Sequence, residues 1–462
     1  MIKRLDYLGA LDNRRDLAER LAETGLSPGA CLAKADRFAG AAAALAGIGP
    51  DRSVGPLRAF SVPGRIEVLG KHTDYAGGSS MVVAAEQGFA LVAAPRRDRQ
   101  VRLVDAVSGE TAGFELGPDL SPPLGHWSNY PMTVARRVAR NFPGVCRGAD
   151  IAFASDLPPA AGMSSSSALI VAVFLALADV NQFAARAEYR RNIHGPLDLA
   201  GYLGTIENGQ TFGSLEGDRG VGTFGGSEDH TAILGAEPGH VSQYAYCPVR
   251  FQRAIPLPAG YTFAVGASGV AAEKTGPAME KYNAASRLAS TLAELWCRHT
   301  GRTDPHLAAV LASGPTAAGD LSRIVRTAMP EGAQADALLA RLNHFIEENG
   351  QILPAAGDAL ARGDWGALGD LVDRSQHAAE RLLGNQVPET SRLARIARQC
   401  GAVAASAFGA GFGGSVWALV ETGRTGSFLR DWAAAYWLEF PQHAATSSFF
   451  VAGAGPAAFQ VG

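Results

Sequence analysis

The sequence has little of what marks secreted, membrane-bound or nucleic-acid-binding proteins. It contains five cysteines in 462 residues and no CxxC pair, so we expect reduced thiols and a cytoplasmic location. It has no run of about 18 consecutive apolar residues, which argues against a membrane-spanning helix. Acidic and basic side chains stand near its beginning, where a signal peptide needs an apolar block, so we expect no secretory signal.

Charge is also scarce in this chain. Charged residues make up 18% of it, the formal net charge is −3, and Lys and Arg are dispersed. A nucleic-acid partner is therefore not expected, because binding to phosphate backbones needs a concentrated basic face. The hydrophobic content of 47% is typical of a globular protein, and the length favours two large domains. Clustered glycines predict segments that approach a ligand closely.

Local patterns predict an α+β fold in two halves that meet near residue 240. Helices are expected within residues 12–47, 127–141 and 281–375, and from residue 165 onward. Strands are expected at residues 57–68, with a break at Pro63-Gly64, and at residues 80–92, 151–154, 261–270 and 415–421. The glycine-rich residues 214–226 predict a flexible loop.

Residues 63–78, PGRIEVLGKHTDYAGG, form the first segment with a chemical signature. They place Arg, Lys, His and Asp between apolar flanks, which favours a half-buried functional loop over a solvated surface turn. The segment is not a P-loop, because five residues separate Gly64 from Gly70 and a histidine follows Lys71.

Residues 158–168, PPAAGMSSSSA, form the second segment and open a helix. Small side chains leave the free N–H groups of a helix start open to an anion, and the helix dipole attracts phosphate. A serine hydroxyl can also ligate magnesium. Four serines exceed what one helix cap needs, so we expect a phosphate-binding loop.

Residues 409–414, GAGFGG, form the third segment and fit the pattern GxGxxG. A dinucleotide-binding fingerprint follows a strand and opens a helix, whereas this turn precedes a strand-like run. A nicotinamide oxidoreductase is therefore disfavoured, and a backbone turn that approaches a ligand fits better. Acidic residues occur in two further places, at Glu207 and in residues 226–230, GSEDH.

In order and spacing, the three segments resemble the three motifs of the GHMP kinases, and galactokinases most closely. Shorter matches occur at Trp127–Tyr130, Gly226–His230 and Tyr282-Asn283. The resemblance implies an N-terminal domain like domain 2 of ribosomal protein S5, at residues 56–240, and a ferredoxin-like C-terminal domain, at 241–462. Residues 1–55 would be a helical extension. ATP and a small sugar would bind in the cleft between the domains of a monomer or weak homodimer.

The resemblance also implies roles for individual residues. Asp229 would be the catalytic base, with Arg65 beside it, and Ser166 and Glu207 would bind Mg²⁺. The sugar would contact Arg65, Lys71, His72, Asp74, Gly226, Asp229 and Tyr282. The nucleotide would contact Trp127, Pro159, Ala160, Ala161, Gly162, Met163, Ser164, Ser165, Ser166, Ser167, Gly409 and Gly411. The expected reaction is ATP-dependent phosphorylation of a monosaccharide at its anomeric C1 hydroxyl.

Two departures from the galactokinase pattern leave alternatives open. Lys71 stands where galactokinases carry Glu, and Glu67 stands where they carry Asn. Either the substrate is a uronic acid or another C6-altered sugar, or Lys71 pairs with Glu67 and the substrate stays close to galactose. The 22 positions between Glu207 and Asp229 indicate an inserted loop, and Glu228 competes with Asp229 for the role of base. A non-catalytic sensor of sugar and ATP is a further alternative.

Overall fold

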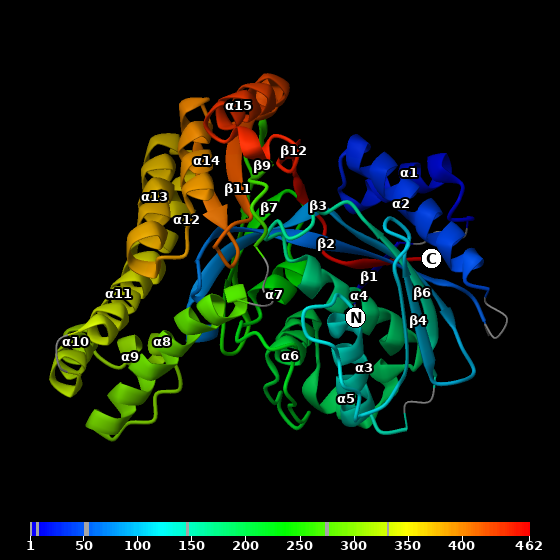
Figure 1. Cartoon of the computed structure of the whole chain (residues 1–462), viewed down its shortest axis with the longest axis horizontal. Helices are drawn as coiled ribbons and strands as arrows, with labels where there is room; N and C mark the ends of the chain where they lie inside the picture. Colours follow the sequence, from blue (N-terminus) through cyan, green and yellow to red (C-terminus); the bar gives the residue numbers. More distant parts are fainter. Residues whose placement is uncertain (1, 6–8, 50–54, 145–146, 273–276, 330–331) are drawn as a thin grey trace.

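The computed structural model describes residues 2–5, 9–49, 55–144, 147–272, 277–329 and 332–462, which form two sheets with helices around them (Figure 1). Within these residues, ten strands make the larger, mixed sheet. Its main path runs β1 (Lys3–Leu5), β14 (Phe459–Val461), β2 (Arg58–Leu69), β3 (Ser79–Pro95), β6 (Ala149–Ser155), β4 (Gln100–Asp105), β5 (Thr111–Glu115). Off this path, β13 (Ala454–Gly455) and β7 (His240–Ala245) pair with β3, and β8 (Arg250–Pro256) pairs with β7.

The larger sheet is buried on both faces, and β3 shows this by its alternation. Val83 and Leu91 belong to the main core, which also contains the residues of α4 (Ser165–Val180). Ala90 and Val92 point to the other face and pack with α1 (Arg14–Leu21) and α2 (Pro28–Gly47). In Figure 1 the dark blue α1 and α2 lie on the opposite side of the sheet from α4. The predicted N-terminal helices thus exist, and they complete the core of this sheet.

Further helices cover the α4 side of the larger sheet. They are α3 (Asn129–Asn141), α5 (Ala187–Asn192), α6 (Pro196–Asn208) and α7 (Glu228–Gly235). The sequence of α4 is apolar on all sides and its residues from Ser167 to Leu177 are buried, as expected for a helix enclosed by protein. Its start, by contrast, stays partly open at Ser165 and Ser166.

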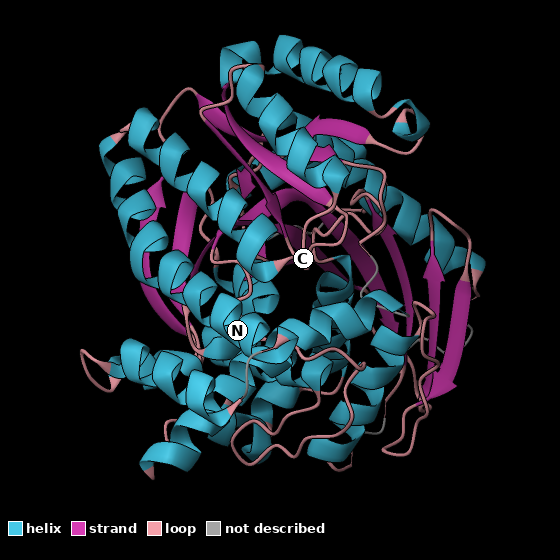
Figure 2. Cartoon of the chain, turned by 60° about the vertical axis from the view of Figure 1, so that its left-hand side comes forward, coloured by secondary structure: helices cyan, strands magenta, loops and turns pink. Residues whose placement is uncertain are grey.

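The second sheet is antiparallel, with the order β10 (Ala404–Phe408), β11 (Ser415–Glu421), β9 (Tyr261–Ala267), β12 (Ser448–Val451). On one face it packs with α14 (Pro388–Gln399) and α15 (Thr425–Glu439). On the other it packs with α13 (Trp365–Ala378). An elongated arm of helices extends from this unit (Figures 1 and 2), namely α8 (Pro277–Thr300), α9 (Leu307–Ala312), α10 (Ala317–Ala328), α11 (Ala333–Glu347) and α12 (Leu353–Arg362).

Short 3₁₀ and π segments join these elements. They are η1 (Ala22–Thr24), η2 (Asp74–Ala76), η3 (Phe183–Ala185), η4 (Glu348–Ile352), η5 (Ala379–Leu383), η6 (Thr422–Arg424) and η7 (Pro441–His443). Among the described residues, no helix combines the length and apolar character needed to cross a membrane.

The α+β fold is confirmed, but the division of the chain differs from the predicted one. The strands β7 and β8 lie beyond residue 240 and still belong to the larger sheet, and β13 and β14 return to it from the C-terminal end. At one edge of this sheet, β1 pairs with β14. Such pairings between distant segments leave no local signal in a sequence.

The strand predicted to break at Pro63-Gly64 is continuous. The chain of β2 runs through both residues, and only its register against β3 shifts there, since Pro63 pairs with Gly88 and Arg65 with Ala84. At this irregularity the N–H of Arg65 turns to the carbonyl of Met163 instead, at 3.2 Å. This hydrogen bond attaches the serine-rich loop before α4 to β2.

Candidate functional site

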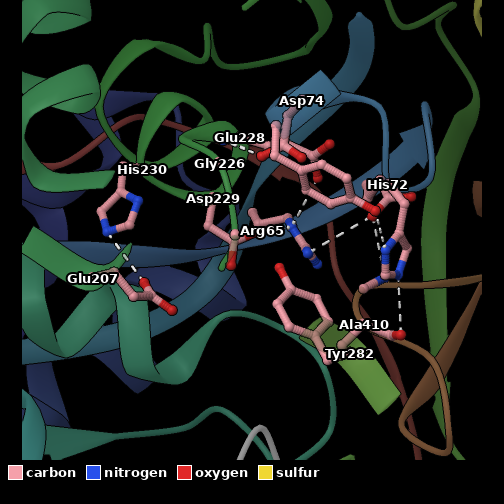
Figure 3. A pocket seen from close by; sticks show the side chains of 14 residues that line it. Arg65, His72, Asp74, Glu207, Gly226, Glu228, Asp229, His230, Tyr282 and Ala410 are labelled. Carbon is pink, nitrogen blue, oxygen red and sulfur yellow. Dashed lines mark hydrogen bonds and ion pairs between the residues drawn. The ribbon is translucent and has the colours of Figure 1, made fainter. Parts of the chain in front are cut away.

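A small cavity lies where the larger sheet, α6, α7, α8 and the turn after β10 meet (Figure 3). Its lining residues are Arg65, Glu67, His72, Asp74, Tyr75, Glu207, Gly225, Gly226, Glu228, Asp229, His230, Tyr282, Gly409 and Ala410. Most of the residues predicted to bind sugar therefore meet in one place.

Arg65 occupies the middle of this cavity, between Asp229 and Glu228 on one side and His72 and Tyr282 on the other (Figure 3). Its Nε donates to Asp229 Oδ1 at 2.8 Å and lies 3.4 Å from Glu228. Another guanidinium nitrogen donates to the carbonyl of Gly162 at 2.8 Å. Burial by itself lowers the pKa of Arg65, but the nearby carboxylates, Asp229 first, raise it above its usual value. Arg65 is a fixed positive charge at the centre of the site.

Asp229 lies at the start of α7, where the helix dipole favours negative charge. Its second oxygen, Oδ2, is 3.1 Å from Ser167 Oγ, and this hydroxyl is also 2.8 Å from Glu207 Oε2. One hydroxyl hydrogen can serve only one of the two carboxylates at a time. Three oxygens from three elements therefore converge with fewer hydrogens than acceptors, an arrangement suited to a cation.

The serine at this position differs from the predicted one. Ser166 was expected to approach Glu207, but the structure brings Ser167 there and turns Ser166 toward the neighbouring cleft. Successive helix residues point about 100° apart, so in a run of four serines only the fold selects the one that meets Glu207.

The loop between β2 and β3 supplies His72 and Asp74. His72 Nε2 is 3.1 Å from the carbonyl of Ala410, which can only accept, so this nitrogen carries hydrogen, and Nδ1 lies 2.8 Å from the hydroxyl of Tyr75. Asp74 Oδ2 accepts from the N–H of Glu228 at 3.1 Å. A Cβ on Gly226 would lie 2.3 Å from this oxygen, so only glycine fits there.

Lys71 does not line the cavity, although it was predicted to contact the sugar. The side chain is 1% exposed, and its Nζ donates to Ser375 Oγ at 3.0 Å. That hydroxyl donates in turn to Glu348 Oε1, which also accepts from the N–H of Gly70. The ammonium is thus directed into the contact between the loop and α13 and away from the cavity.

Carboxyl groups dominate the electrostatics of the cavity. Burial raises the pKa of Glu67 to about 7, although Arg65 and Lys71 oppose the shift. Burial and the neighbouring Glu67 raise the pKa of Glu228 well above its usual value. Glu67 and Glu228 therefore hold protons in a pH range where free carboxylates are ionised. Asp229 differs from them, because it has the closest contact with the positive charge of Arg65.

Most of the predicted nucleotide residues line a second, adjoining cleft of about 490 Å³. Trp127, with its ring 5.8 Å from that of Phe153, forms an aromatic wall. The predicted residues on its surface are Trp127, Pro159, Ala160, Gly162, Ser164, Ser165 and Ser166. The first turn of α4 starts here, so its N–H groups are available to an anion.

Five residues of the predicted nucleotide set lie elsewhere. Ala161 and Met163 are buried below the loop, where their carbonyls accept from Ser415 Oγ and from the N–H of Arg65. Gly409 lines the first cavity, with φ +82°, and a Cβ there would lie 2.9 Å from the carbonyl of Gly162. Gly411 packs against Asn385. The fifth, Ser167, is buried and contacts Glu207 and Asp229.

The inserted loop before α7 is tethered, although it was predicted to be flexible. Arg136 on α3 and Asp218 form an ion pair of 2.7 Å, with both side chains 3% exposed. Arg137 donates to the carbonyl of Gln210, and Asn283 on α8 holds the loop at the carbonyl of Gly222. These contacts fix the glycines that wall the cavity.

Six lining residues were missing from the predicted site, although Glu228 had been named as a competitor of Asp229: Glu67, Tyr75, Gly225, Glu228, His230 and Ala410. Glu67 carried a usable signal, because it stands two residues after Arg65 in a strand and so points to the same face. His230 Nε2 lies 3.4 Å from Glu207, a contact that sequence alone does not reveal.

Comparison with family models identifies three parts of the chain. Residues 129–204 match the N-terminal domain of GHMP kinases, and residues 358–436 match the C-terminal domain. Residues 52–95, which carry Arg65, His72 and Asp74, match the galactokinase galactose-binding signature. The matches cover α4, the loop between β2 and β3, and helices that pack on the second sheet.

Known proteins support the same assignment. A galactokinase from Chloroflexus aggregans is 29% identical over 383 residues, 82% of this chain and 88% of that protein. One from Roseiflexus sp. is 29% identical over 380 residues, 81% and 86% of the two chains. The crystal structure of Lactococcus lactis galactokinase complexed with galactose shares the fold, with a TM-score of 0.70, 22% identity and coverage of 87% of this chain and 94% of that one. The chain therefore belongs to the GHMP kinases and is a sugar kinase of the galactokinase-like type.

Proposed function

We propose that this protein transfers a phosphoryl group from ATP to the anomeric C1 hydroxyl of a neutral monosaccharide, galactose or a close relative. The observation that carries the proposal is the chain of contacts from Glu207 through Ser167, Asp229 and Arg65 to the carbonyl of Gly162, which joins the acid-rich cavity to the nucleotide cleft. A sugar hydroxyl in the cavity and a phosphate over the start of α4 would meet at Asp229. The C1 position follows from the resemblance to galactokinases.

Asp229 is the proposed base for the sugar hydroxyl. A general base must lie within hydrogen-bond reach of the proton that it takes, and Asp229 lines the cavity beside the nucleotide cleft. Arg65, held at 2.8 Å from Asp229, keeps the carboxylate oriented and adds positive charge next to the transferring phosphoryl group. Glu228 is a poorer base for this step, because its raised pKa leaves it protonated.

Mg²⁺ fits the oxygens at the junction. Ser167 Oγ and Glu207 Oε2 would hold the ion, both being hard oxygen ligands on fixed helices. Within the described residues, no group of three His, Cys, Asp or Glu side chains is placed to hold a metal, which suits an ion that completes its shell with ATP phosphates and water. When bound, it would neutralise charge on the phosphates.

A neutral sugar fits this cavity better than a uronic acid. The carboxyl groups of Glu67, Asp74, Glu207, Glu228 and Asp229 line it. A substrate carboxylate would face them with Arg65 as its main positive partner, and Arg65 is already engaged. Lys71, the residue that suggested an acidic sugar, is bonded to Ser375. Hydroxyl groups, in contrast, donate readily to carboxylates.

The test is ADP release with Mg-ATP across galactose, arabinose, galacturonate and glucuronate, for the wild type and Asp229→Asn. We expect galactose or another neutral sugar to be preferred, and Asp229→Asn to lose about 10²- to 10⁴-fold in kcat. Preference for a uronic acid would refute the neutral substrate. Binding of ATP and sugar without turnover would favour the sensor alternative, and full activity of Asp229→Asn would refute its role as base.

A further inference from the structure

Glu67 is a lining residue whose burial the mechanism above does not explain. It lies on β2, two residues after Arg65, and is 3% exposed. Its Oε2 accepts from the N–H of Gly409 at 3.3 Å and lies 3.8 Å from Arg65. Its Oε1 is buried and has no hydrogen-bond partner among the described residues. Half of this carboxyl group is thus unsatisfied at the wall of the cavity.

An unsatisfied buried oxygen is expensive. Leaving a buried polar group without a partner costs about 1–3 kcal/mol, and more for a charged one, so native proteins rarely retain such groups without a use. A smaller or apolar side chain on β2 would avoid this cost. Because Glu67 lines the cavity, a bound ligand can supply the missing partner.

The chemistry of the missing partner can be read from the surroundings of Glu67. The positive groups near the carboxyl are Arg65 and Lys71, and both have other partners, Asp229 and Ser375. The negative ones are Glu348, Asp229 and Glu228. A ligand anion would therefore be repelled, whereas a hydroxyl group, which can both donate and accept, would satisfy Oε1 whether or not Glu67 is protonated.

We propose that Glu67 is a substrate-binding residue that determines specificity: its Oε1 forms a hydrogen bond with one hydroxyl of the neutral sugar, and its ionised form disfavours sugars that carry an acid. The proposal rests on the proposed sugar kinase activity and names a contact within that same site. It also gives a role to a glutamate that the related motif lacks.

The experiment is a double-mutant cycle between protein and substrate. kcat/KM and calorimetric affinity are measured for galactose and its 2-, 3-, 4- and 6-deoxy derivatives, with the wild type, Glu67→Gln and Glu67→Asn. We expect one deoxy sugar to lose about 10- to 100-fold with the wild type, as for a hydrogen bond to a charged group. The same deletion should cost about threefold or less in Glu67→Asn, which is too short to reach. Glu67→Gln keeps the shape and should improve galacturonate relative to galactose.

A matched control is Glu86→Gln, the same change at a buried glutamate on β3 whose oxygen binds the N–H of Ser27, away from the cavity. It should leave all deoxy penalties unchanged. Equal penalties in the wild type and both Glu67 variants would overturn the role of Glu67 while leaving the kinase activity intact. Failure of the wild type to bind or phosphorylate any neutral sugar would overturn both proposals.

Discussion

Replacing Glu67 by Gln should change how the stability of the protein depends on pH. Burial raises the pKa of Glu67 from its usual 4.5 to about 7 in the fold, against the opposing charges of Arg65 and Lys71. The folded state therefore holds this proton over a range in which the unfolded chain has lost it. Stability is fully present below the unfolded pKa and is lost as pH rises from 4.5 to 7.

The size of the effect follows from the two pKa values. Their difference of 2.5, at about 1.36 kcal/mol for each pKa unit, corresponds to about 3 kcal/mol, most of which falls between pH 5 and pH 8. Glutamine cannot ionise, so Glu67→Gln should avoid this loss. Its free energy of unfolding should exceed that of the wild type by about 2–3 kcal/mol more at pH 8 than at pH 5.

The assay is urea unfolding at several pH values between 5 and 8, followed by tryptophan fluorescence, for the wild type and Glu67→Gln. The measured quantity is the difference between their free energies of unfolding at each pH. If this difference does not change with pH, Glu67 does not hold its proton in the fold, and the electrostatic description of the cavity is wrong.

Three further changes test the site. Ser167→Ala should raise the Mg²⁺ concentration needed for half-maximal activity at least tenfold, because Ser167 contacts Glu207. Ser166→Ala should change this concentration less, and equal effects of the two changes would contradict the assignment of Ser167. Gly226→Ala should raise KM for the sugar about tenfold or more, since its Cβ would clash with a carboxylate oxygen in the cavity, and an unchanged KM would refute this. Asp218→Asn should lower the free energy of unfolding by about 3–5 kcal/mol in urea titration, because it breaks a buried ion pair.

Much of the site could be predicted from the sequence because its motifs are local. Arg65, His72 and Asp74 stand within ten residues of a strand and the loop after it, so the same backbone geometry brings them to one place. The small side chains before α4 likewise predict an anion site from the free N–H groups of any helix start. These inferences need only short segments of chain, and the structure gathers the residues at one cavity or at the adjoining cleft.

Other features depend on contacts between distant residues. Lys71 follows the sugar motif in sequence, yet its ammonium turns to Ser375, 304 positions away. The loop before α7 has the composition of a flexible segment, and a buried pair with Arg136 fixes it. In each case the local pattern is compatible with two outcomes, and a partner from another element selects one.

The sequence by itself determined the class of chemistry, because its motifs, in their fixed order, supply an anion-binding helix start, oxygen ligands for a cation and a base. The tertiary structure decided which atoms perform each part. In the structure Ser167, and not Ser166, contacts Glu207, and Lys71 contacts Ser375 outside the cavity. Glu67 Oε1 has no hydrogen-bond partner among the described residues. The tertiary structure also joined β7, β8 and the C-terminal strands to the larger sheet. The physical reason is that side-chain direction, burial and strand pairing are set by packing between segments far apart in the chain, and a local sequence pattern carries no record of them.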